Sequence, residues 1–208
     1  NYMHQKLVKI INHINVIQLF PSLLWTVGHC WHGFGFCTLI SYGLLYKNAA
    51  NKKLRDKNFV FNQYIFFCLA HLWIEGWVYQ LTILGWICLS LYLSLWPVCW
   101  YWLVCKMDSF NEVCHVFFAV ILWVGFEWWR GTFCFDGYMF NFAALSMILD
   151  FPLLYQSADL FGVWFPSFIL PSIVGLHSFN SLRWWKLATS FLLISFIFIY
   201  GYFKTHNS

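Results

Sequence analysis

The chain has 208 residues, of which 61% are hydrophobic, 24% aromatic and only 10% charged, and its mean hydropathy is +0.64. Because an ordinary soluble domain carries roughly a quarter of its residues as charged side chains, this composition excludes a soluble globular protein and indicates an integral membrane protein. The small formal charge of +4 is a signal of membrane topology and does not indicate nucleic-acid binding.

Seven apolar segments predict seven membrane-spanning helices, which is about what 208 residues can hold at roughly 20 residues per span. We expect the sixth to be bent, because Pro166 and Pro171 each remove a backbone donor. The fold class is therefore predicted to be all-α, a polytopic membrane helical bundle that forms a single transmembrane domain over residues 1–208. The predicted spans cover about residues 16–28, 34–46, 59–78, 83–104, 113–129, 160–176 and 187–203.

The basic residues are distributed unevenly between the predicted loops. Lys and Arg concentrate on the cytoplasmic side of membrane proteins, which predicts a cytoplasmic N-terminus and an external C-terminus. Only Arg130 and Lys204 then lie outside, and the loop 131–157, between spans five and six, is external. The ten basic residues on the cytoplasmic side are Lys6, Lys9, Lys47, Lys52, Lys53, Arg55, Lys57, Lys106, Arg183 and Lys186.

Two charged residues, Glu127 and Arg130, lie at the outer end of the predicted fifth span. Their spacing lets both side chains lie on one face of a helix and pair. Ionisable groups at membrane depth are costly and often functional. The alternative is an interfacial pair within an aromatic belt that includes Trp128 and Trp129. We expect the pair to position the loop 131–157.

Glu75 is the sole charged residue between Lys57 and Lys106. It lies where the third and fourth predicted spans approach the outer face. Two interpretations remain open: its carboxylate faces a polar cavity, or it belongs to a turn at the surface.

The histidines raise the question of a metal or haem site. His29 and His32 flank a predicted turn, whereas His71 and His115 lie within or beside predicted spans. Haem ligation by two histidines needs both rings at the same depth, and the topology puts His71 and His115 near opposite ends. We therefore expect no metal and no cofactor.

Three segments between residues 126 and 175 resemble a known family when they are taken in order. The segments are similar to a Glu-Trp-Leu-Arg-Gly span end, a Gly-Phe-Pro-Trp-Asn-type loop and a Gln-x-Ala-Asp-x-x-Gly-Val run. These occur in the N-terminal membrane domain of apolipoprotein N-acyltransferase, the bacterial enzyme that adds the third acyl chain to lipoproteins. Here they read Glu127-Trp128-Trp129-Arg130-Gly131, Gly137-Tyr138-Met139-Phe140-Asn141 and Gln156-Ser157-Ala158-Asp159-Leu160-Phe161-Gly162-Val163.

The resemblance covers nearly the whole chain and implies an outer face shaped to receive lipid acyl chains and a lipid-modified protein terminus. The loop departs from the family, since Met139 and Phe140 replace its Pro and Trp, and Ala144-Leu145 replaces a Gly-Tyr. The residues that the resemblance assigns to a lipid-facing or structural site, together with Glu75, are Glu127, Trp128, Arg130, Gly131, Gly137, Phe140, Asn141, Gln156, Asp159 and Gly162.

The family's Glu-Lys-Cys catalytic triad resides in an external nitrilase-like domain that follows the last membrane helix. This chain begins at Asn1 without an initiator methionine and ends at Ser208, where that domain would begin. Cys134, the thiol of the outer loop, has Phe133 and Phe135 as neighbours, a setting that disfavours a reactive thiolate. We therefore expect no catalytic residue in this chain, which transfers no acyl group by itself. Two interpretations within the family stay open: the chain is the membrane part of a longer enzyme, or it is a stand-alone relative without the catalytic domain.

The predicted function is that of a membrane-embedded domain that binds lipid and lipoprotein and supports acyl transfer from phospholipid to a lipoprotein N-terminus. The alternative is a non-catalytic structural subunit of a membrane protein complex. The expected partners are membrane phospholipid, a lipoprotein substrate, and a nitrilase-like domain or other membrane subunits, with no nucleic acid. We expect a bacterial inner membrane, with an organellar membrane as the alternative.

Overall fold

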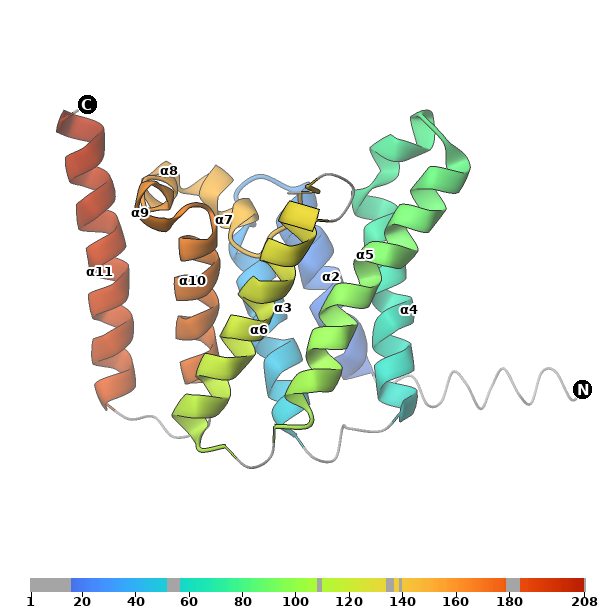
Figure 1. The fold of residues 1–208 in the computed structure, drawn as a ribbon, viewed down its shortest axis with the longest axis horizontal. Coiled ribbons are helices and arrows are strands. Elements are labelled where there is room, and N and C mark those ends of the chain that lie inside the picture. Colours follow the sequence, from blue (N-terminus) through green and yellow to red (C-terminus); the bar gives the residue numbers. More distant parts are fainter. Residues whose placement is uncertain are drawn as a thin grey trace, which may run out of the picture.

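The computed structural model of the protein describes residues 16–51, 57–107, 110–133, 137–138, 140–178 and 184–207. All regular elements in these ranges are helices, as the composition predicts (Figure 1). They are α2 (Val16–Cys30), α3 (Phe36–Ala50), α4 (Lys57–Ile74), the short 3-10 helix η2 (Gly76–Gln80), α5 (Ile83–Val104), α6 (Glu112–Phe133), α7 (Leu145–Asp150), α8 (Pro152–Tyr155), α9 (Ala158–Phe161), α10 (Trp164–His177) and α11 (Trp184–Asn207).

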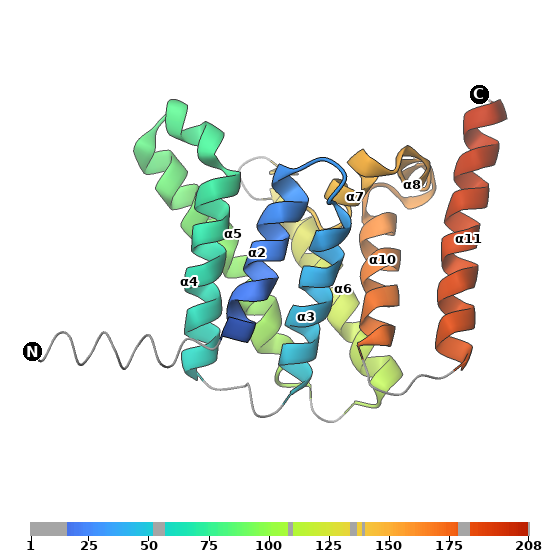
Figure 2. The ribbon, with the colours of Figure 1, turned by 180° about the vertical axis from the view of Figure 1, so that it is seen from behind.

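The long helices α2, α3, α4, α5, α6, α10 and α11 coincide with the seven predicted apolar segments and run alternately up and down (Figures 1 and 2). Among the described residues, α5, α6 and α11 are each long and apolar enough to cross a membrane. The bent pair 152–161 and 164–177 is a fourth candidate, with a bend of 115°, and α4 is a shorter apolar helix. The structure therefore supports a membrane protein with three or four candidate spans, and the count of seven stays a prediction.

Two predicted spans have different bounds in the structure, one at its start and one at its end. The sixth does not run unbroken from residue 160, because Gly162 adopts a left-handed φ of 72° that ends α9, and α10 begins two residues later. Pro166 falls in the first turn of α10, where a missing N–H costs little, and Pro171 lies inside the helix. The third predicted span stops at Ile74, before η2.

The two ends of the bundle differ in what they carry. At one end lie the last turns of α3, α5 and α10 and the first turns of α4, α6 and α11 (Figures 1 and 2). At the other end lie η2, the short helices α7, α8 and α9, and the C-terminal end of α11. Four basic residues of the described part belong to the first end, and Arg130 and Lys204 belong to the second, as the charge pattern predicts; the four are Lys47, Lys57, Lys106 and Lys186.

The core between α2, α3, α5 and α6 is built from aromatic rings. Tyr42, Trp100 and Trp123 are almost fully buried, and their ring centroids lie 5.0–5.1 Å apart. Trp25 of α2 contacts Trp123 at 5.7 Å. The Trp100 indole donates to the carbonyl of Ala119 over 2.7 Å, so this buried donor is satisfied. Interlocked rings therefore fix the helices that carry the site described below.

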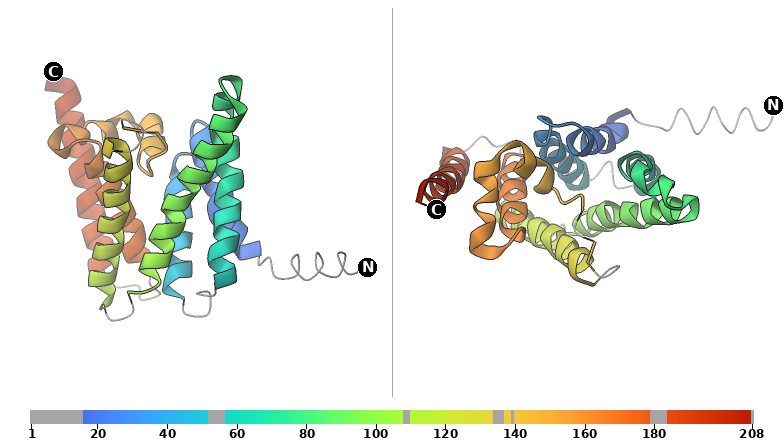
Figure 3. Two further views of the ribbon diagram at one scale, coloured as in Figure 1. Left: turned by 45° about the vertical axis from the view of Figure 1, so that its right-hand side comes forward. Right: turned by 90° about the horizontal axis from the view of Figure 1, so that it is seen from above.

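The outer surface is apolar, as expected for helices that face lipid. Large side chains such as Phe61 and Phe191 are 62% and 72% exposed. Seen from above, α11 lies at the edge of the bundle (Figure 3). It is tied to α6 by the ion pair of the buried Lys186 with Glu112, whose Nζ and Oε2 atoms are 3.4 Å apart. At its other end, α11 packs so closely on α8 that a Cβ added to Gly201 would lie 2.3 Å from the carbonyl oxygen of Leu153.

Candidate functional site

Asp150 joins the turn between α2 and α3 to the segment 137–162. Its two carboxylate oxygens accept from the backbone N–H groups of Gly33 and Gly35 at 2.7 and 2.6 Å. Backbone N–H groups of a turn can form an anion-binding concavity, and here an internal carboxylate binds the first and third N–H groups of the run Gly33-Phe34-Gly35. Asp150 was not among the site residues predicted from the sequence. The available signal was an acidic residue in one predicted outer loop and a Gly-x-Gly turn in another.

Glu75 is buried directly beyond the end of α4, with only 1% of its side chain exposed. One carboxylate oxygen accepts from the Tyr138 hydroxyl at 2.7 Å and from the Trp77 indole at 3.2 Å. The other accepts from the side-chain amide of Asn141. Burial raises the pKa of the Glu75 carboxyl, and these three hydrogen bonds oppose the shift. Glu75 therefore lies in the turn between α4 and η2, as one interpretation held, but its carboxylate is buried among three donors and is not a surface group.

Glu127, on α6, is 5% exposed and holds the backbone of the following loop. Its Oε1 accepts from the N–H of Ala143 at 2.7 Å and from the Trp123 indole at 2.8 Å. The Ser167 hydroxyl of α10 lies close to the same carboxylate. The carboxylate thus satisfies a loop N–H at a buried position.

Arg130 lies one turn further along α6 and is also 5% exposed. Its guanidinium donates to the carbonyl of Asn141 at 3.2 Å and lies 4.9 Å from the ring centroid of Phe142. The predicted direct ion pair with Glu127 is wrong, because no nitrogen–oxygen contact within 4.0 Å joins the two side chains among the described residues. Each side chain instead forms a hydrogen bond with the backbone of the loop, which agrees with the expectation that the two residues position the loop.

Asn141 connects the two buried charges. Its carbonyl accepts from Arg130, and its side chain donates to Glu75. Asn141 has a φ of 59°, in the left-handed region that asparagine tolerates better than most residues. Gly137 has a φ of 98°, and a Cβ there would lie 2.8 Å from the carbonyl oxygen of Gly131. These conformations fold the loop back over Glu75, Glu127 and Arg130, which we call the buried charge cluster.

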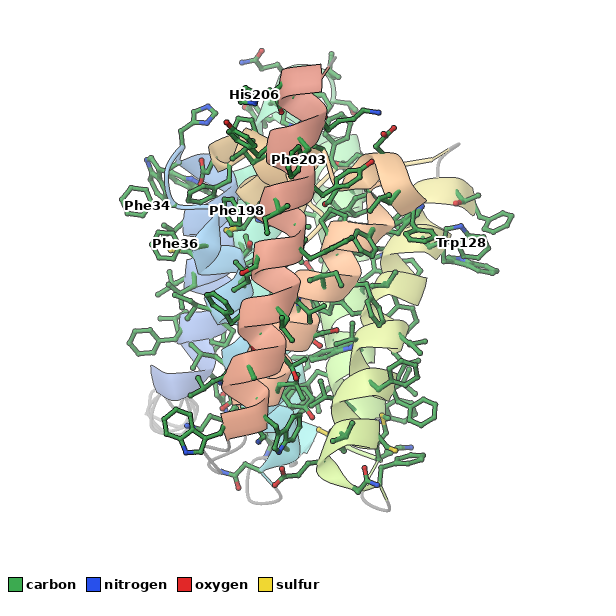
Figure 4. The ribbon with its side chains drawn as sticks, turned by 90° about the vertical axis from the view of Figure 1, so that its left-hand side faces the viewer. Phe34, Phe36, Trp128, Phe198, Phe203 and His206 are labelled. Carbon is green, nitrogen blue, oxygen red and sulfur yellow. The ribbon has the colours of Figure 1, made fainter. Side chains whose placement is uncertain are left out.

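Two further predicted residues, Trp128 and Phe140, project away from the buried charge cluster. They are 45% and 59% exposed. Trp128 packs on Phe133, with ring centroids 5.4 Å apart, and Phe140 on Tyr138 at 5.3 Å. Trp128 lies at the periphery of the bundle, across from Phe34 on the other side and at a similar height (Figure 4). Aromatic side chains at this level are typical of a membrane interface.

The Gln-x-Ala-Asp-x-x-Gly run makes its side-chain contacts with α11. Asp159 pairs with Lys204 at 2.7 Å and accepts from the Tyr200 hydroxyl at 3.2 Å. The carbonyl of Gln156 accepts from the N–H of Asp159 at 3.2 Å, and Gly162 supplies the left-handed break before α10. The predicted site residues therefore fall into three groups: the buried charge cluster with the loop residues above it, the exposed Trp128 and Phe140, and this run beside α11.

Sequence reasoning missed Tyr138 as a ligand of Glu75 and did not connect His71 with the site. His71, on α4, is 2% exposed and lines a small cavity together with Glu127, Arg130 and Asn141. Within the described ranges, no group of three or more His, Cys, Asp or Glu side chains has a geometry suited to a metal ion. Cys134, Asp136 and Met139 lie outside the described residues, as do Lys6, Lys9, Lys52, Lys53, Arg55 and Arg183.

Comparison with known proteins connects this arrangement to one family. Residues 21–176 match the sequence model described as the apolipoprotein N-acyltransferase N-terminal domain. The apolipoprotein N-acyltransferase of Rhodopirellula baltica is 29% identical over 127 residues, which cover 52% of this chain and 20% of the relative. The chain thus matches about a fifth of the length of this curated relative. The residues that match the family model, 21–176, run from α2 to α10 and include the whole buried charge cluster.

Proposed function

The chain belongs to the family of apolipoprotein N-acyltransferase N-terminal domains, and from this we propose that it is the lipid- and lipoprotein-binding membrane platform of an acyltransferase of that type. The observation that carries the proposal is the match over residues 21–176, because these residues contain the helices and the loop that form the buried charge cluster. In this proposal, the chain binds and orients the substrates and does not itself perform the chemistry.

We further propose that all seven long helices cross the membrane, with the N-terminus cytoplasmic and the C-terminus external. Lys47, Lys106 and Lys186 then belong to the cytoplasmic end, where positive charge is favoured. The loop that covers the buried charge cluster belongs to the external end. The membrane that suits this reading best is a bacterial inner membrane.

The loop over the buried charge cluster is the part of the platform best suited to present a substrate. Its backbone is fixed from below by Glu127 and Arg130, so its exposed face is held in a defined shape. Phe140, on that face, is 59% exposed and offers apolar contact to acyl chains. Preorganised surfaces bind with a smaller loss of conformational freedom, which is what a lipid-binding platform requires.

Acyl transfer to an amine through a covalent intermediate needs an activated nucleophile, a base and donors for the oxyanion. We propose that a nitrilase-like domain supplies these groups and that its Cys attacks an ester of the phospholipid. A thioester forms as the ester C–O bond breaks, and lysophospholipid leaves with the proton of the thiol. The α-amino group of the lipoprotein then attacks this thioester, so that an amide forms, the C–S bond breaks and the thiol regains a proton. The membrane chain contributes the positioning of both substrates.

The proposal is tested by reconstituting the purified chain in phospholipid vesicles with a diacylated lipopeptide. N-acylation is measured with the chain alone, with a nitrilase-like domain of the family alone, and with both. Transfer that requires both components supports the proposal. If the nitrilase-like domain is equally active with and without the chain, the proposal is wrong, and a structural subunit of a membrane complex becomes the better interpretation.

A further inference from the structure

We infer that an apolar groove between α2 and α4, from Leu19 to Trp31, and a polar pocket beside Asp150 together bind one phospholipid whose headgroup ends in a primary ammonium. The groove holds an acyl chain and the pocket holds the headgroup. The inference rests on the proposed membrane topology and not on the acyl-transfer reaction, and it adds a defined lipid site to the proposed platform.

The groove forms because small side chains lie where α2 and α4 meet. The two helices lie side by side and run in the same direction (Figure 2). Ser22 and Ala70, which line the groove, are buried, whereas the larger Leu23 and Leu69 beside them are exposed. The small residues therefore form the floor and the large ones the rim of a cavity of about 330 Å³. An exposed rim on a helix pair that faces the bilayer lets a lipid enter sideways.

The groove offers an apolar surface to its occupant. The two hydroxyl groups of its lining, on Ser22 and Thr26, donate to the carbonyls of Leu19 and Ser22 in their own helix, at 2.9 Å each. Most other lining side chains are aliphatic or aromatic. Within the hydrocarbon core, the apolar group available to fill such a groove is an acyl chain, and close contact with the walls adds dispersion attraction.

The length of the groove matches one leaflet of a bilayer. At its inner end, α2 and α4 are bridged through Gln18, which accepts from the side-chain amides of Asn62 at 3.0 Å and of Gln63 at 2.8 Å. The groove begins at Leu19, directly beyond this bridge, and reaches Trp31, a distance of about 18 Å at 1.5 Å per residue. The hydrocarbon core is roughly 30 Å thick, so this is close to the depth of the outer leaflet alone.

The polar pocket continues the groove at its outer end. Trp31 lines both cavities, and the pocket has a volume of about 190 Å³. His32, Ser146 and Asp150 are among the residues that line it. An apolar groove followed by a polar pocket has the same order of parts as an acyl chain followed by a headgroup. A lipid whose chain lies in the groove therefore brings its headgroup to the pocket.

The charge of the pocket selects the headgroup. Among the described residues that line it, Asp150 is the one with a formal charge. Each of its oxygens accepts one backbone N–H, from Gly33 or Gly35, and a carboxylate oxygen can accept two hydrogen bonds. A primary ammonium supplies three further donors and an opposite charge, whereas an anionic headgroup meets a like charge.

The size of the pocket favours a phospholipid over a lipid-modified protein terminus. An ethanolamine headgroup ends at its ammonium and fits a pocket of about 190 Å³. The α-amino group of a lipoprotein is followed by a peptide chain, which needs further space. We therefore assign the site to a phospholipid of the phosphatidylethanolamine type.

The test is photo-crosslinking of the native full chain in phosphatidylcholine nanodiscs that contain a small fraction of phosphatidylethanolamine with a diazirine in its acyl chain. Crosslinked peptides are identified by mass spectrometry. Helix α11 is the control for general lipid contact, because Phe191 and Leu192 on it are strongly exposed. We expect the groove residues of α2 and α4 to be labelled several-fold more than α11. Equal labelling of the three helices overturns the inference.

Unlabelled competitors then test the headgroup. Phosphatidylethanolamine should lower groove labelling several-fold and leave α11 unchanged, whereas equal amounts of phosphatidylglycerol should have little effect. The inference is overturned if phosphatidylglycerol competes equally well. It is also overturned if a diacylated lipopeptide with a free α-amino group competes better than phosphatidylethanolamine, since the occupant would then be a lipoprotein.

Two variants test the groove and the pocket separately. Val27→Phe fills the groove and should lower its labelling several-fold, whereas Val113→Phe, the same change at an exposed position of α6, should not. Asp150→Asn removes the charge of the pocket and should reduce the preference for phosphatidylethanolamine over phosphatidylglycerol. If labelling is uniform while acyl transfer still requires the chain, this inference is wrong and the platform proposal stands.

Discussion

The side-chain amide of Asn141 donates a hydrogen bond to the carboxylate of Glu75, which lies 66 residues earlier in the chain. The carbonyl of the same Asn141 accepts from Arg130, so one loop residue contacts a buried acid and a buried base. Without this residue, Arg130 would lose its hydrogen bond to the loop, and Glu75 would keep only the Tyr138 hydroxyl and the Trp77 indole as donors. The loop and the buried charge cluster therefore depend on each other.

Glu127 should matter through its bond to the loop backbone. We expect Glu127→Leu to lower the free energy of unfolding by about 1–3 kcal/mol, because it leaves the buried N–H of Ala143 without an acceptor. Glu127→Gln keeps an acceptor oxygen and should cost less. Amide hydrogen exchange at Ala143, measured in detergent or nanodiscs, should accelerate in Glu127→Leu.

The control for this comparison is Trp128→Leu, which changes the neighbouring residue on the same helix but a side chain that is 45% exposed. Exchange at Ala143 should be unaffected by that change. Unaltered exchange at Ala143 in Glu127→Leu would contradict the role that we assign to the carboxylate.

Gly137 should not tolerate a side chain. We expect Gly137→Ala to destabilise the loop, since its φ of 98° disfavours alanine and the new Cβ would lie 2.8 Å from the carbonyl oxygen of Gly131. Gly125→Ala is the matched control, because an added Cβ at this position in α6 meets no atom within 4 Å. Alanine in a helix interior is favoured over glycine by about 0.5–1 kcal/mol. A thermal melt should show opposite signs for the two variants, and equal shifts would count against the loop conformation.

Glu75 should make the stability depend on pH. Its carboxyl pKa in the folded protein is raised above the usual 4.5, so the folded chain binds this proton more tightly than the unfolded chain does. The stability that this proton contributes is fully present below the usual pKa and is lost as the pH rises through the folded pKa. Glu75→Gln cannot titrate and should lack this contribution.

The measurement is the melting temperature of the native chain and of Glu75→Gln between about pH 4 and pH 8. We expect the native chain to lose stability relative to the variant as the pH increases across this range. A constant difference between the two proteins would show that Glu75 keeps its ordinary pKa on folding.

The proposed topology can be tested with two single cysteines in a background without the eight native ones. His32→Cys lies in the exposed turn between α2 and α3, and Lys106→Cys lies beyond the end of α5 at the opposite end. An impermeant thiol reagent added to intact cells should modify position 32 and spare position 106. After the membrane is permeabilised, both should react. The reverse labelling in intact cells would invert the proposed orientation.

Much of the helical framework could be predicted from the sequence, because long apolar runs leave the backbone little alternative to helix in a membrane. The boundaries of the helices were harder to predict. The break before α10 depends on the left-handed conformation of Gly162, and a glycine within an apolar run does not by itself indicate such a conformation. The number of spans was also not decided by the apolar runs, because helices such as α3 are short for a bilayer.

The site was predictable only in part. Glu127 and Arg130 were identified by their charge in an apolar context, and both prove to be buried. Their partners were not predictable, because spacing on one helix suggests that they bond each other, whereas folding brings the loop backbone closer. Residues such as His71 and Tyr138 carry no local signal. Tyr138 matters through its bond to Glu75, 63 residues earlier in the chain, and His71 lines a cavity with residues of α6.

The most direct test of the platform proposal is binding of a diacylated lipopeptide to the purified chain in phospholipid nanodiscs. Binding is measured by fluorescence anisotropy against a control peptide of the same sequence without the lipid, and against empty nanodiscs. We expect saturable binding of the lipopeptide that exceeds its partition into empty nanodiscs, and weaker binding by Gly137→Ala than by Gly125→Ala. If the lipopeptide binds to the folded native chain no better than to empty nanodiscs, the chain is not a lipoprotein-binding platform.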